Sequence, residues 1–246
     1  PHPVDEEGIV LNERPCDYYY VTPGHQVPTG VTMSSTRRRQ LLEHAARHDA
    51  VIIEDDYDSE SNFTLNPLPA LKASDRSGRV VYVSSLSKAL SPGLRLGFMV
   101  ADPDLIDEAR ALRRLVYRHP PTNIQYQMAH FLAQGHYETH LRRYHYDSAQ
   151  RWERLHAALQ RYLPSCRALA GSEHANAFWL QTPAQINTQQ LTWRAAHAGV
   201  LIEPGARHFL SAAPPDNYFR MGFHAINPDA IAQGVEVLRG QLEQMG

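Results

Sequence analysis

Short apolar runs alternate with helical patterns in the first half of the chain. Runs rich in β-branched and aromatic residues predict strands at 17–22, 50–55, 80–85 and 96–101. A helix pattern occupies 34–47, after the turn residues Pro28-Thr29-Gly30. Near-continuous apolar strands separated by helices predict a largely parallel sheet that is buried on both faces. Ligands bind such sheets outside the carboxyl ends of the strands.

The second half of the chain predicts a run of helices followed by a smaller mixed unit. Helices are expected at 103–117, 122–134 and 137–162, and Pro164 stops the last of them. Strands at 177–181, 200–202 and 218–223 and helices at 188–197 and 228–242 then follow. We therefore predict an α/β protein with a mostly parallel-sheet domain over 1–136. A bridging long helix over 137–163 leads to a small α+β domain over 164–246.

Composition narrows the class of protein without indicating a function. The chain has 246 residues with ordinary hydrophobic (43%) and charged (20%) fractions, and its net charge of −2 gives no electrostatic attraction to nucleic acid. Cys16 and Cys166 make no disulfide framework, and no stretch reads as a membrane span or a signal peptide, so we expect a cytoplasmic protein. Because the chain lacks an initiator Met, we expect it to be an internal piece of something longer.

The strongest chemical pattern is a lysine after one predicted strand and an acid and a tyrosine after another. Lys88 follows the strand that ends at Ser85, Asp55 ends the preceding strand, and Tyr57 lies two residues after it. This combination is what an enzyme needs to hold pyridoxal phosphate (PLP). The amine condenses with the cofactor aldehyde, a carboxylate pairs with the pyridine nitrogen, and the phenol reaches the ring oxygen.

The same segment offers a phosphate anchor. Ser85 and Ser87 supply hydroxyls, and Arg95 supplies a forked pair of charged donors seven residues after Lys88. These groups together favour a phosphorylated ligand over a solvated surface loop.

A metal site is the competing interpretation of the acidic cluster. Asp55, Asp56 and Asp58 could bind a cation, and this hypothesis predicts that Lys88→Ala leaves ligand binding intact. No nucleotide-binding glycine loop accompanies the cluster. The histidine pairs 44/48 and 136/140 have i, i+4 spacing but no convincing third ligand, so we predict no metal site.

Several segments resemble a known family. The string Glu54-Asp55-Asp56-Tyr57-Asp58-Ser59-Glu60 and the Lys88 segment at 84–97 resemble the cofactor site of fold-type I aminotransferases. The segments at 20–30 and 135–143, with the pair Arg37-Arg38, resemble the aminotransferase-like domain of MocR/GabR transcriptional regulators, a branch of the GntR group. The resemblance covers essentially the whole chain and implies a partial fold-type I PLP-dependent transferase fold.

The resemblance also implies a role for each matching residue. Lys88 is the catalytic lysine that forms the Schiff base, Asp55 pairs with the pyridine nitrogen, and Tyr57 contacts the ring hydroxyl. Arg220 matches the arginine that grips the α-carboxylate of the substrate or effector, with Arg207 as a nearby rival. The implied phosphate ligands are Ser85, Ser87 and Arg95.

The sequence departs from the family in two places. Conventional aminotransferases carry Asn directly before Pro-Thr-Gly, where this chain has Val27, which leaves His25 or Gln26 as substitutes. The family's large domain also begins well upstream of Pro1, in a part that supplies the phosphate loop, the stacking aromatic residue and much of the dimer interface. We therefore expect this chain by itself to bind PLP weakly or not at all.

The function implied is a PLP-dependent sensor of an amino acid or amine, within a homodimeric regulator of the MocR type. DNA would be reached only through an N-terminal winged helix-turn-helix domain that is absent from this chain, and transaminase activity would be residual at most. The alternative is a genuine aminotransferase of the kynurenine/2-aminoadipate type, in which Lys88 is both Schiff base and proton shuttle.

Overall fold

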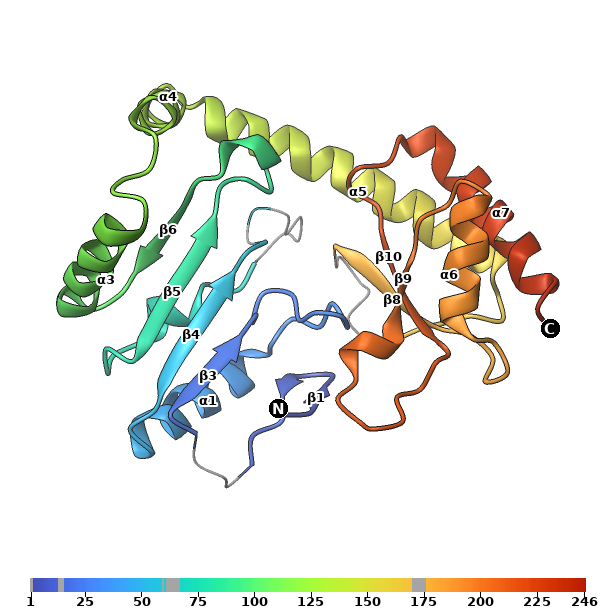
Figure 1. Cartoon of the computed structure of the whole chain (residues 1–246), viewed down its shortest axis with the longest axis horizontal. Coiled ribbons are helices and arrows are strands. Elements are labelled where there is room, and N and C mark those ends of the chain that lie inside the picture. The colour runs from blue at the N-terminus through green and yellow to red at the C-terminus, as the bar shows by residue number, and fades with distance from the viewer. Residues whose placement is uncertain (1, 13–15, 59, 61–66, 170–175) are drawn as a thin grey trace. The chain divides into compact units, whose positions relative to one another are not determined.

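The helices and strands divide into two units (Figure 1). The computed structural model describes residues 2–12, 16–58, 60, 67–169 and 176–246. The sheet unit comprises residues 2–26 and 32–145, and the C-terminal unit comprises 27–31 and 146–246. The boundary at 145/146 falls inside the long helix α5 (His136–Tyr162), which the sequence predicts at 137–162.

A four-stranded sheet in the order β3-β4-β5-β6 forms the centre of the sheet unit. Strands β3 (Tyr18–Val21), β4 (Val51–Asp56) and β5 (Val80–Ser85) are parallel, and β6 (Gly97–Val100) is antiparallel to β5. The predicted strands and the largely parallel order are confirmed. A Cβ at Gly97 would lie 2.7 Å from the Ser84 carbonyl oxygen, so glycine allows β6 to approach β5 this closely.

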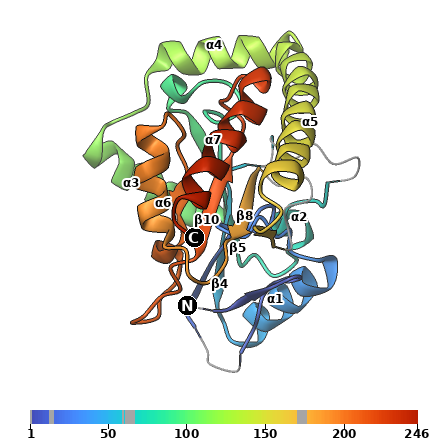
Figure 2. The ribbon, with the colours of Figure 1, turned by 90° about the vertical axis from the view of Figure 1, so that its right-hand side faces the viewer.

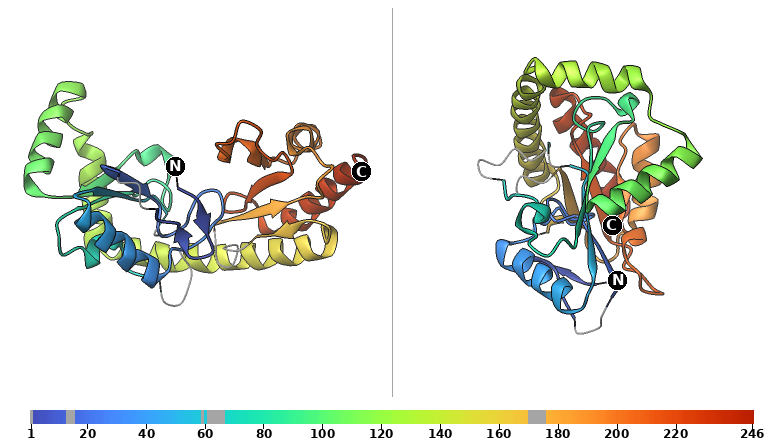
Figure 3. Two further views of the ribbon diagram at one scale, coloured as in Figure 1. Left: turned by 90° about the horizontal axis from the view of Figure 1, so that it is seen from below. Right: turned by 90° about the vertical axis from the view of Figure 1, so that its left-hand side faces the viewer.

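Helix α1 (Ser35–Arg47) covers one face of this sheet (Figure 3). Ser34 caps it, since its hydroxyl accepts a hydrogen bond from the Arg37 amide at 3.1 Å. The short helix α2 (Leu71–Ser74) joins the same core through Leu71. This core contains ten buried residues: Ile9, Tyr19, Val21, Met33, Leu41, Ala45, Ala50, Ile52, Leu71 and Val80.

The opposite face of the sheet is not buried in the described chain. Side chains alternate between the faces of a strand, so Tyr18 and Tyr20 point away from the α1 core. They are 68% and 65% exposed. The prediction of a sheet buried on both faces is therefore wrong for the described residues, because α1 and α2 pack on the Tyr19 and Ile52 face.

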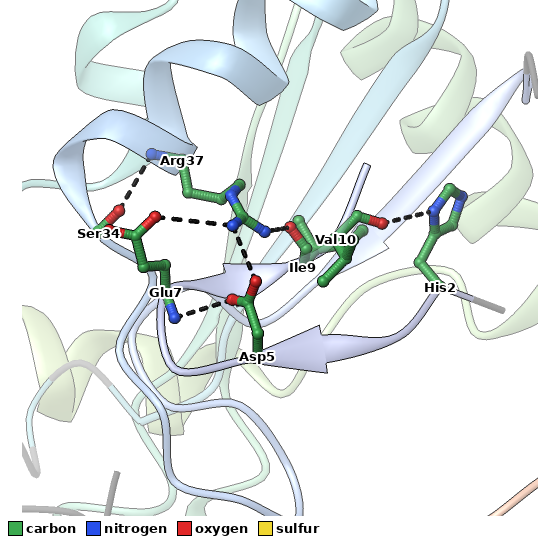
Figure 4. A network of polar contacts seen from close by, with 7 residues as sticks. All are labelled: His2, Asp5, Glu7, Ile9, Val10, Ser34 and Arg37. Carbon is green, nitrogen blue, oxygen red and sulfur yellow. Dashed lines mark hydrogen bonds and ion pairs between the residues drawn. The ribbon is translucent and has the colours of Figure 1, made fainter. Parts of the chain in front are cut away.

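An N-terminal hairpin that the sequence does not predict is tied to α1 (Figure 4). It consists of β1 (Val4–Asp5) and β2 (Gly8–Ile9). The Arg37 guanidinium lies 2.9 Å from the Asp5 carboxylate and 3.6 Å from that of Glu7, and it donates to the Ile9 carbonyl. Arg37 is 13% exposed, so one largely buried cation connects the hairpin to the first turn of α1.

Helices α3 (Pro103–Val116) and α4 (Thr122–Ala133) precede α5 and match their predicted ranges closely. Asp102 caps α3 by accepting from the Asp104 amide at 3.0 Å, and Pro103 occupies the first turn, where proline costs no hydrogen bond. Among the residues that the structure describes, no helix combines the length and apolar character needed to span a membrane.

The C-terminal unit is built on an antiparallel sheet in the order β7-β8-β10-β9. Its strands are β7 (Arg167–Ala168), β8 (Ala177–Gln181), β9 (Glu203–Pro204) and β10 (Tyr218–Gly222). Helices α6 (Thr188–His197) and α7 (Ile231–Glu243) lie side by side (Figure 2). Phe178 is fully buried, and its ring stacks 5.8 Å from that of Trp152 on α5.

The strand predicted at 200–202 is wrong. The Val200 amide still bonds the Ala195 carbonyl at 2.8 Å, because the chain leaves α6 through a turn at Gly199 with a positive φ of 86°. Pairing with β10 begins only at Glu203, which lies opposite Arg220. The helix predicted at 228–242 is also divided, into a 3-10 turn at Pro228–Ala230 and then α7.

Candidate active site

The predicted cofactor residues gather at one edge of the parallel sheet. In the β4–β5 register, Asp55 lies opposite Val83, and β4 ends at the next residue, Asp56. Parallel strands bring their carboxyl ends to a common edge. The loops that carry Tyr57 and Lys88 therefore start from neighbouring positions in the sheet unit.

Asp55 and Asp56 lie on opposite faces of β4 and have different partners. Asp55 is half-buried on the open face and accepts a hydrogen bond from the Tyr20 hydroxyl of β3. Partial burial and the bonded carboxylate raise the pKa of the Tyr20 phenol to about 12. Asp56 lies on the α1 face and accepts from the Tyr82 hydroxyl at 2.7 Å. Burial raises the pKa of Asp56 although the hydrogen bond from Tyr82 opposes it.

Lys88 is held at two points. Its Nζ lies 2.6 Å from Oδ1 of Asp58 and 4.4 Å from the centre of the Tyr57 ring. The Lys88 side chain is 37% exposed, whereas that of Asp58 is 3% exposed. The other Asp58 oxygen lies 3.4 Å from Nδ1 of His25. Sequence reasoning assigned Asp58 only to the metal hypothesis and missed this contact.

The three acids of the proposed metal cluster therefore have separate partners. Asp55 bonds Tyr20, Asp56 bonds Tyr82, and Asp58 pairs with a lysine and a histidine. No group of three or more His, Cys, Asp or Glu side chains within the described ranges has the arrangement of a metal site.

The predicted phosphate ligands shape the loop that follows β5. The Ser85 hydroxyl accepts from the Ser87 amide at 3.2 Å, and the buried Ser87 hydroxyl accepts from the Leu96 amide at 3.2 Å. Arg95 follows the 3-10 turn at Pro92–Leu94 with a positive φ of 48°, and its side chain is exposed. A non-glycine residue in this left-handed region is uncommon. Ser87 thus closes the loop, and Arg95 presents its guanidinium to solvent.

The first turns of α5 brace both site loops. Tyr137 donates to the Glu60 carboxylate at 2.9 Å, and Nε2 of His145 lies 2.7 Å from the Glu60 carbonyl oxygen. Nε2 of His140 lies 2.7 Å from the Ala89 carbonyl oxygen, one residue after Lys88. Burial and the Glu60 carboxylate raise the pKa of Tyr137. Tyr137 and His140, two residues of the segment at 135–143, thus hold the site loops in place.

His25 and Gln26, the two expected substitutes for the family asparagine, precede Val27, and the imidazole of His25 already has a partner. His25 and Gln26 are buried, at 4% and 9% exposure. The His25 ring faces Asp58, and its backbone carbonyl accepts from the Tyr57 hydroxyl at 3.3 Å. Tyr57, His25 and Asp58 therefore form one connected group around the lysine.

Arg220 belongs to the C-terminal unit, whereas the site residues described above belong to the sheet unit. It faces Trp179 across the β8–β10 register, and its Nη1 lies 3.3 Å from Oε2 of Glu203 on β9. Arg207 and His208 also reach Glu203, at 3.4 and 3.2 Å. Glu203, which sequence reasoning missed, is thus a carboxylate shared by three basic side chains.

Only two lysines occur in the chain, Lys72 and Lys88. Lys72 is half-buried on α2, where its Nζ lies 3.2 Å from the fully buried carboxylate of Asp75. Lys88 is therefore the candidate for Schiff-base formation on this chain, and Lys72 is an internal control for it.

Comparison with known proteins adds a family and a set of relatives. Residues 21–238 match the family described as aminotransferase class I and II. The chain is 38% identical over 94% of its length to the HTH-type transcriptional regulator TauR of Rhodobacter capsulatus, and covers 48% of that protein. It is 34% identical over 97% of its length to the probable rhizopine catabolism regulatory protein MocR of Rhizobium meliloti, and covers 49% of it. The chain thus spans about half the length of these curated relatives.

A solved structure shows the same fold. The chain aligns with the kynurenine aminotransferase of Pyrococcus horikoshii, determined in complex with PMP, with a TM-score of 0.89 and 27% identity. The alignment covers 99% of this chain and 63% of that one.

Proposed function

Because the chain belongs to the class I and II aminotransferase family, we propose that its sheet unit holds PLP through Lys88. The observation that carries the proposal is the place of the Lys88 amine, beside the Tyr57 ring at the carboxyl edge of the parallel strands. The fold itself is the mixed α/β fold of fold-type I aminotransferases, present here in part. PMP, which the Pyrococcus horikoshii structure contains, is the amino form of PLP.

The residues at the edge fit this cofactor in charge and in exposure. Lys88 is exposed enough to be reached, and Asp55 places a carboxylate on the open face of β4. When bound, PLP supplies an aldehyde that captures amines and a ring that withdraws electrons. We assign Asp55 to the ring nitrogen and Tyr57 to the ring hydroxyl.

The phosphate and the ligand carboxylate are assigned to other groups. We assign the phosphate to Ser85, Ser87 and Arg95, two hydroxyls and one guanidinium. The exposed Arg95 can meet an anion directly, whereas the buried Ser87 hydroxyl would have to give up its bond to Leu96. We assign the carboxylate of the amino-acid ligand to Arg220, whose forked donors suit that group. Lys88 then has a second task, which is to accept and return a proton near the captured amine.

We further propose that the chain is the effector-sensing part of a MocR-type transcriptional regulator. This is supported by its sequence identity of 38% and 34% to two proteins named as regulators, and by its alignment with about half of each. An amino acid or amine would shift the protein between two states by binding them with different affinity. DNA contact and dimerisation are assigned to the intact homodimeric protein.

The alternative function is amino-group transfer between an amino acid and a 2-oxo acid. It is supported by the similarity to the Pyrococcus horikoshii kynurenine aminotransferase. Steady turnover of amino acid and 2-oxo acid by the intact protein would favour the enzyme. Ligand-dependent DNA binding without turnover would favour the regulator.

Covalent capture tests the cofactor site directly. The intact protein is incubated with PLP, reduced with borohydride and digested for mass spectrometry. We expect the pyridoxyl label on Lys88, and we expect little on Lys72, which lies on α2 and is paired with Asp75 at the end of that helix. Equal labelling of the two lysines would refute the assignment, and so would an unchanged total amount of label in Lys88→Arg.

A further inference from the structure

Asp58 is a buried acid in direct contact with the predicted catalytic amine. Its side chain is 3% exposed, and a carboxylate so far from water is costly unless charged or polar groups pair with it. It has such a group on each oxygen, Lys88 Nζ at 2.6 Å and His25 Nδ1 at 3.4 Å. Neither the family match nor the relatives assign it a role.

We propose that Asp58 is a positioning residue for Lys88, and that His25 fixes the orientation of Asp58. The carboxylate is the counter-ion that holds the amine as an ammonium against the Tyr57 ring until the amine is used. This inference rests on the proposed function, since it gives a partner to the lysine that the function requires.

The contacts around the lysine restrict a side chain that is otherwise flexible. Lysine has four rotatable carbon–carbon bonds and an ammonium with three donors, so a single exposed lysine samples many positions. Here a 2.6 Å ion pair fixes the nitrogen, and the Tyr57 ring at 4.4 Å adds a cation–π contact on a second side. Tyr57 is itself tied by its hydroxyl to the His25 carbonyl at 3.3 Å.

The same geometry gives the proton a defined acceptor. An ammonium has no lone pair, so Lys88 must lose one proton before its nitrogen can act as a nucleophile. Oδ1 of Asp58 is within hydrogen-bond reach of that proton, and the His25 ring lies beside the other carboxylate oxygen. The carboxylate therefore orients the amine and also lowers its reactivity while the ion pair is intact.

Other charges face this group and set the size of the expected effect. The Asp58 charge adds to the burial that raises the pKa of Asp56, and the Arg38 cation on α1 opposes it. From α5, Nε2 of His140 contacts the Ala89 carbonyl beside Lys88. Asp58 is the acid in direct contact with the amine, so its removal is expected to dominate over these neighbours.

The test titrates the amines of Lys72 and Lys88 in the cofactor-free intact protein. Both are methylated reductively with isotope-labelled formaldehyde and followed by NMR against pH, with Lys88→Arg to assign the signals. In Asp58→Asn we expect the Lys88 midpoint to fall by about one pH unit or more, a tenfold loss of proton affinity. The Lys72 midpoint should stay the same, and Asp58→Glu should keep most of the Lys88 value.

A reciprocal variant covers the case in which Asp58→Asn does not fold. Lys88→Met removes the partly exposed partner, and we then expect the Asp58 carboxyl to titrate about one pH unit higher than in the wild-type chain. An unchanged Lys88 midpoint in folded Asp58→Asn, or an unchanged Asp58 midpoint in Lys88→Met, would overturn the proposal.

The titrations and the PLP-capture experiment can fail separately. If the wild-type protein fails to capture PLP while the midpoints shift as expected, the cofactor assignment is refuted and the role of Asp58 in holding the amine is supported. If PLP is captured on Lys88 with unshifted midpoints, the cofactor assignment stands and the role of Asp58 is refuted.

Discussion

Replacing Arg220 by lysine should weaken the binding of ligands that carry a carboxylate, and of those ligands only. Arg220 is 23% exposed in its side chain and stands across from Glu203 in the β9–β10 register. Lysine keeps the charge but loses the forked pair of donors. Losing one charge-assisted hydrogen bond costs about 1.5–3 kcal/mol, which corresponds to roughly 10- to 150-fold in affinity.

Replacing Glu203 should have the opposite effect on the affinity for a ligand carboxylate. Its carboxylate already lies 3.3 Å from Arg220, so a ligand carboxylate must compete with it. A partly exposed ion pair is worth about 0.2–1 kcal/mol, and Glu203 is shared with Arg207 and His208. Glu203→Gln should therefore tighten carboxylate binding by roughly 1.5- to 5-fold.

Calorimetric titration of the intact, PLP-loaded protein measures both effects. The probes are L-alanine and ethylamine, which differ by the carboxylate. Arg207→Lys is the matched control, because Arg207 contacts the same glutamate but is 61% exposed. The reasoning fails if Arg207→Lys weakens L-alanine more than Arg220→Lys does, or if Arg220→Lys weakens ethylamine equally.

Three further predictions concern the framework of the site. Burial favours neutral Asp75, but hydrogen bonds led by that from the Val80 amide outweigh it and lower the Asp75 pKa. Asp75→Asn should therefore lower the free energy of unfolding at pH 7 by about 2–4 kcal/mol, measured by urea titration. The difference between the variant and the wild type should shrink as the pH falls below 3.8, toward the lowered pKa of Asp75. Arg37→Ala should detach the hairpin at 4–9 from α1 and speed amide exchange there about tenfold or more, with α4 unchanged. Tyr137→Phe should cost about 1.5 kcal/mol, seen as a drop of roughly 3–6 °C in the unfolding temperature, and an unchanged temperature would show that the Glu60 bond contributes nothing.

The sequence predicts elements whose pattern is local. Strand β5 has the predicted bounds of 80–85, the apolar run at 80–83 and the two serines after it, and the Asp102-Pro103 pair marks the start of α3. The shared edge of β4 and β5 also follows from sequence, because parallel order places the carboxyl ends together. These features depend on propensity and period, which a single chain displays.

What the sequence does not predict depends on contacts between distant residues. Asp58 and His25 are 33 positions apart, and no spacing rule joins them. The bond from His140 to Ala89 spans 51 positions, and that from Tyr137 to Glu60 spans 77. The hairpin at the N-terminus has strands of two residues each, too short for a periodic signal.

One-sided coverage of the sheet has the same origin. The apolar character of β3 to β5 is real, but it does not say which chain segment covers each face. Tyr18 and Tyr20 alternate with buried Tyr19 and Val21, and this alternation in β3 was visible only as a run of aromatic residues.

The two adjacent aspartates of β4 constrain how this protein can vary in length. Asp55 faces the open side of the sheet, and Asp56 faces the helical core with its Tyr82 partner. A strand that gains or loses one residue turns every later side chain to the other face. Such a change would turn Asp56 toward the open face and Asp55 into the core, even though the sequence still contains two adjacent aspartates. Insertions and deletions within 51–56 should therefore be rejected more strongly than point substitutions, and length differences among related chains should accumulate in the turns that flank this strand.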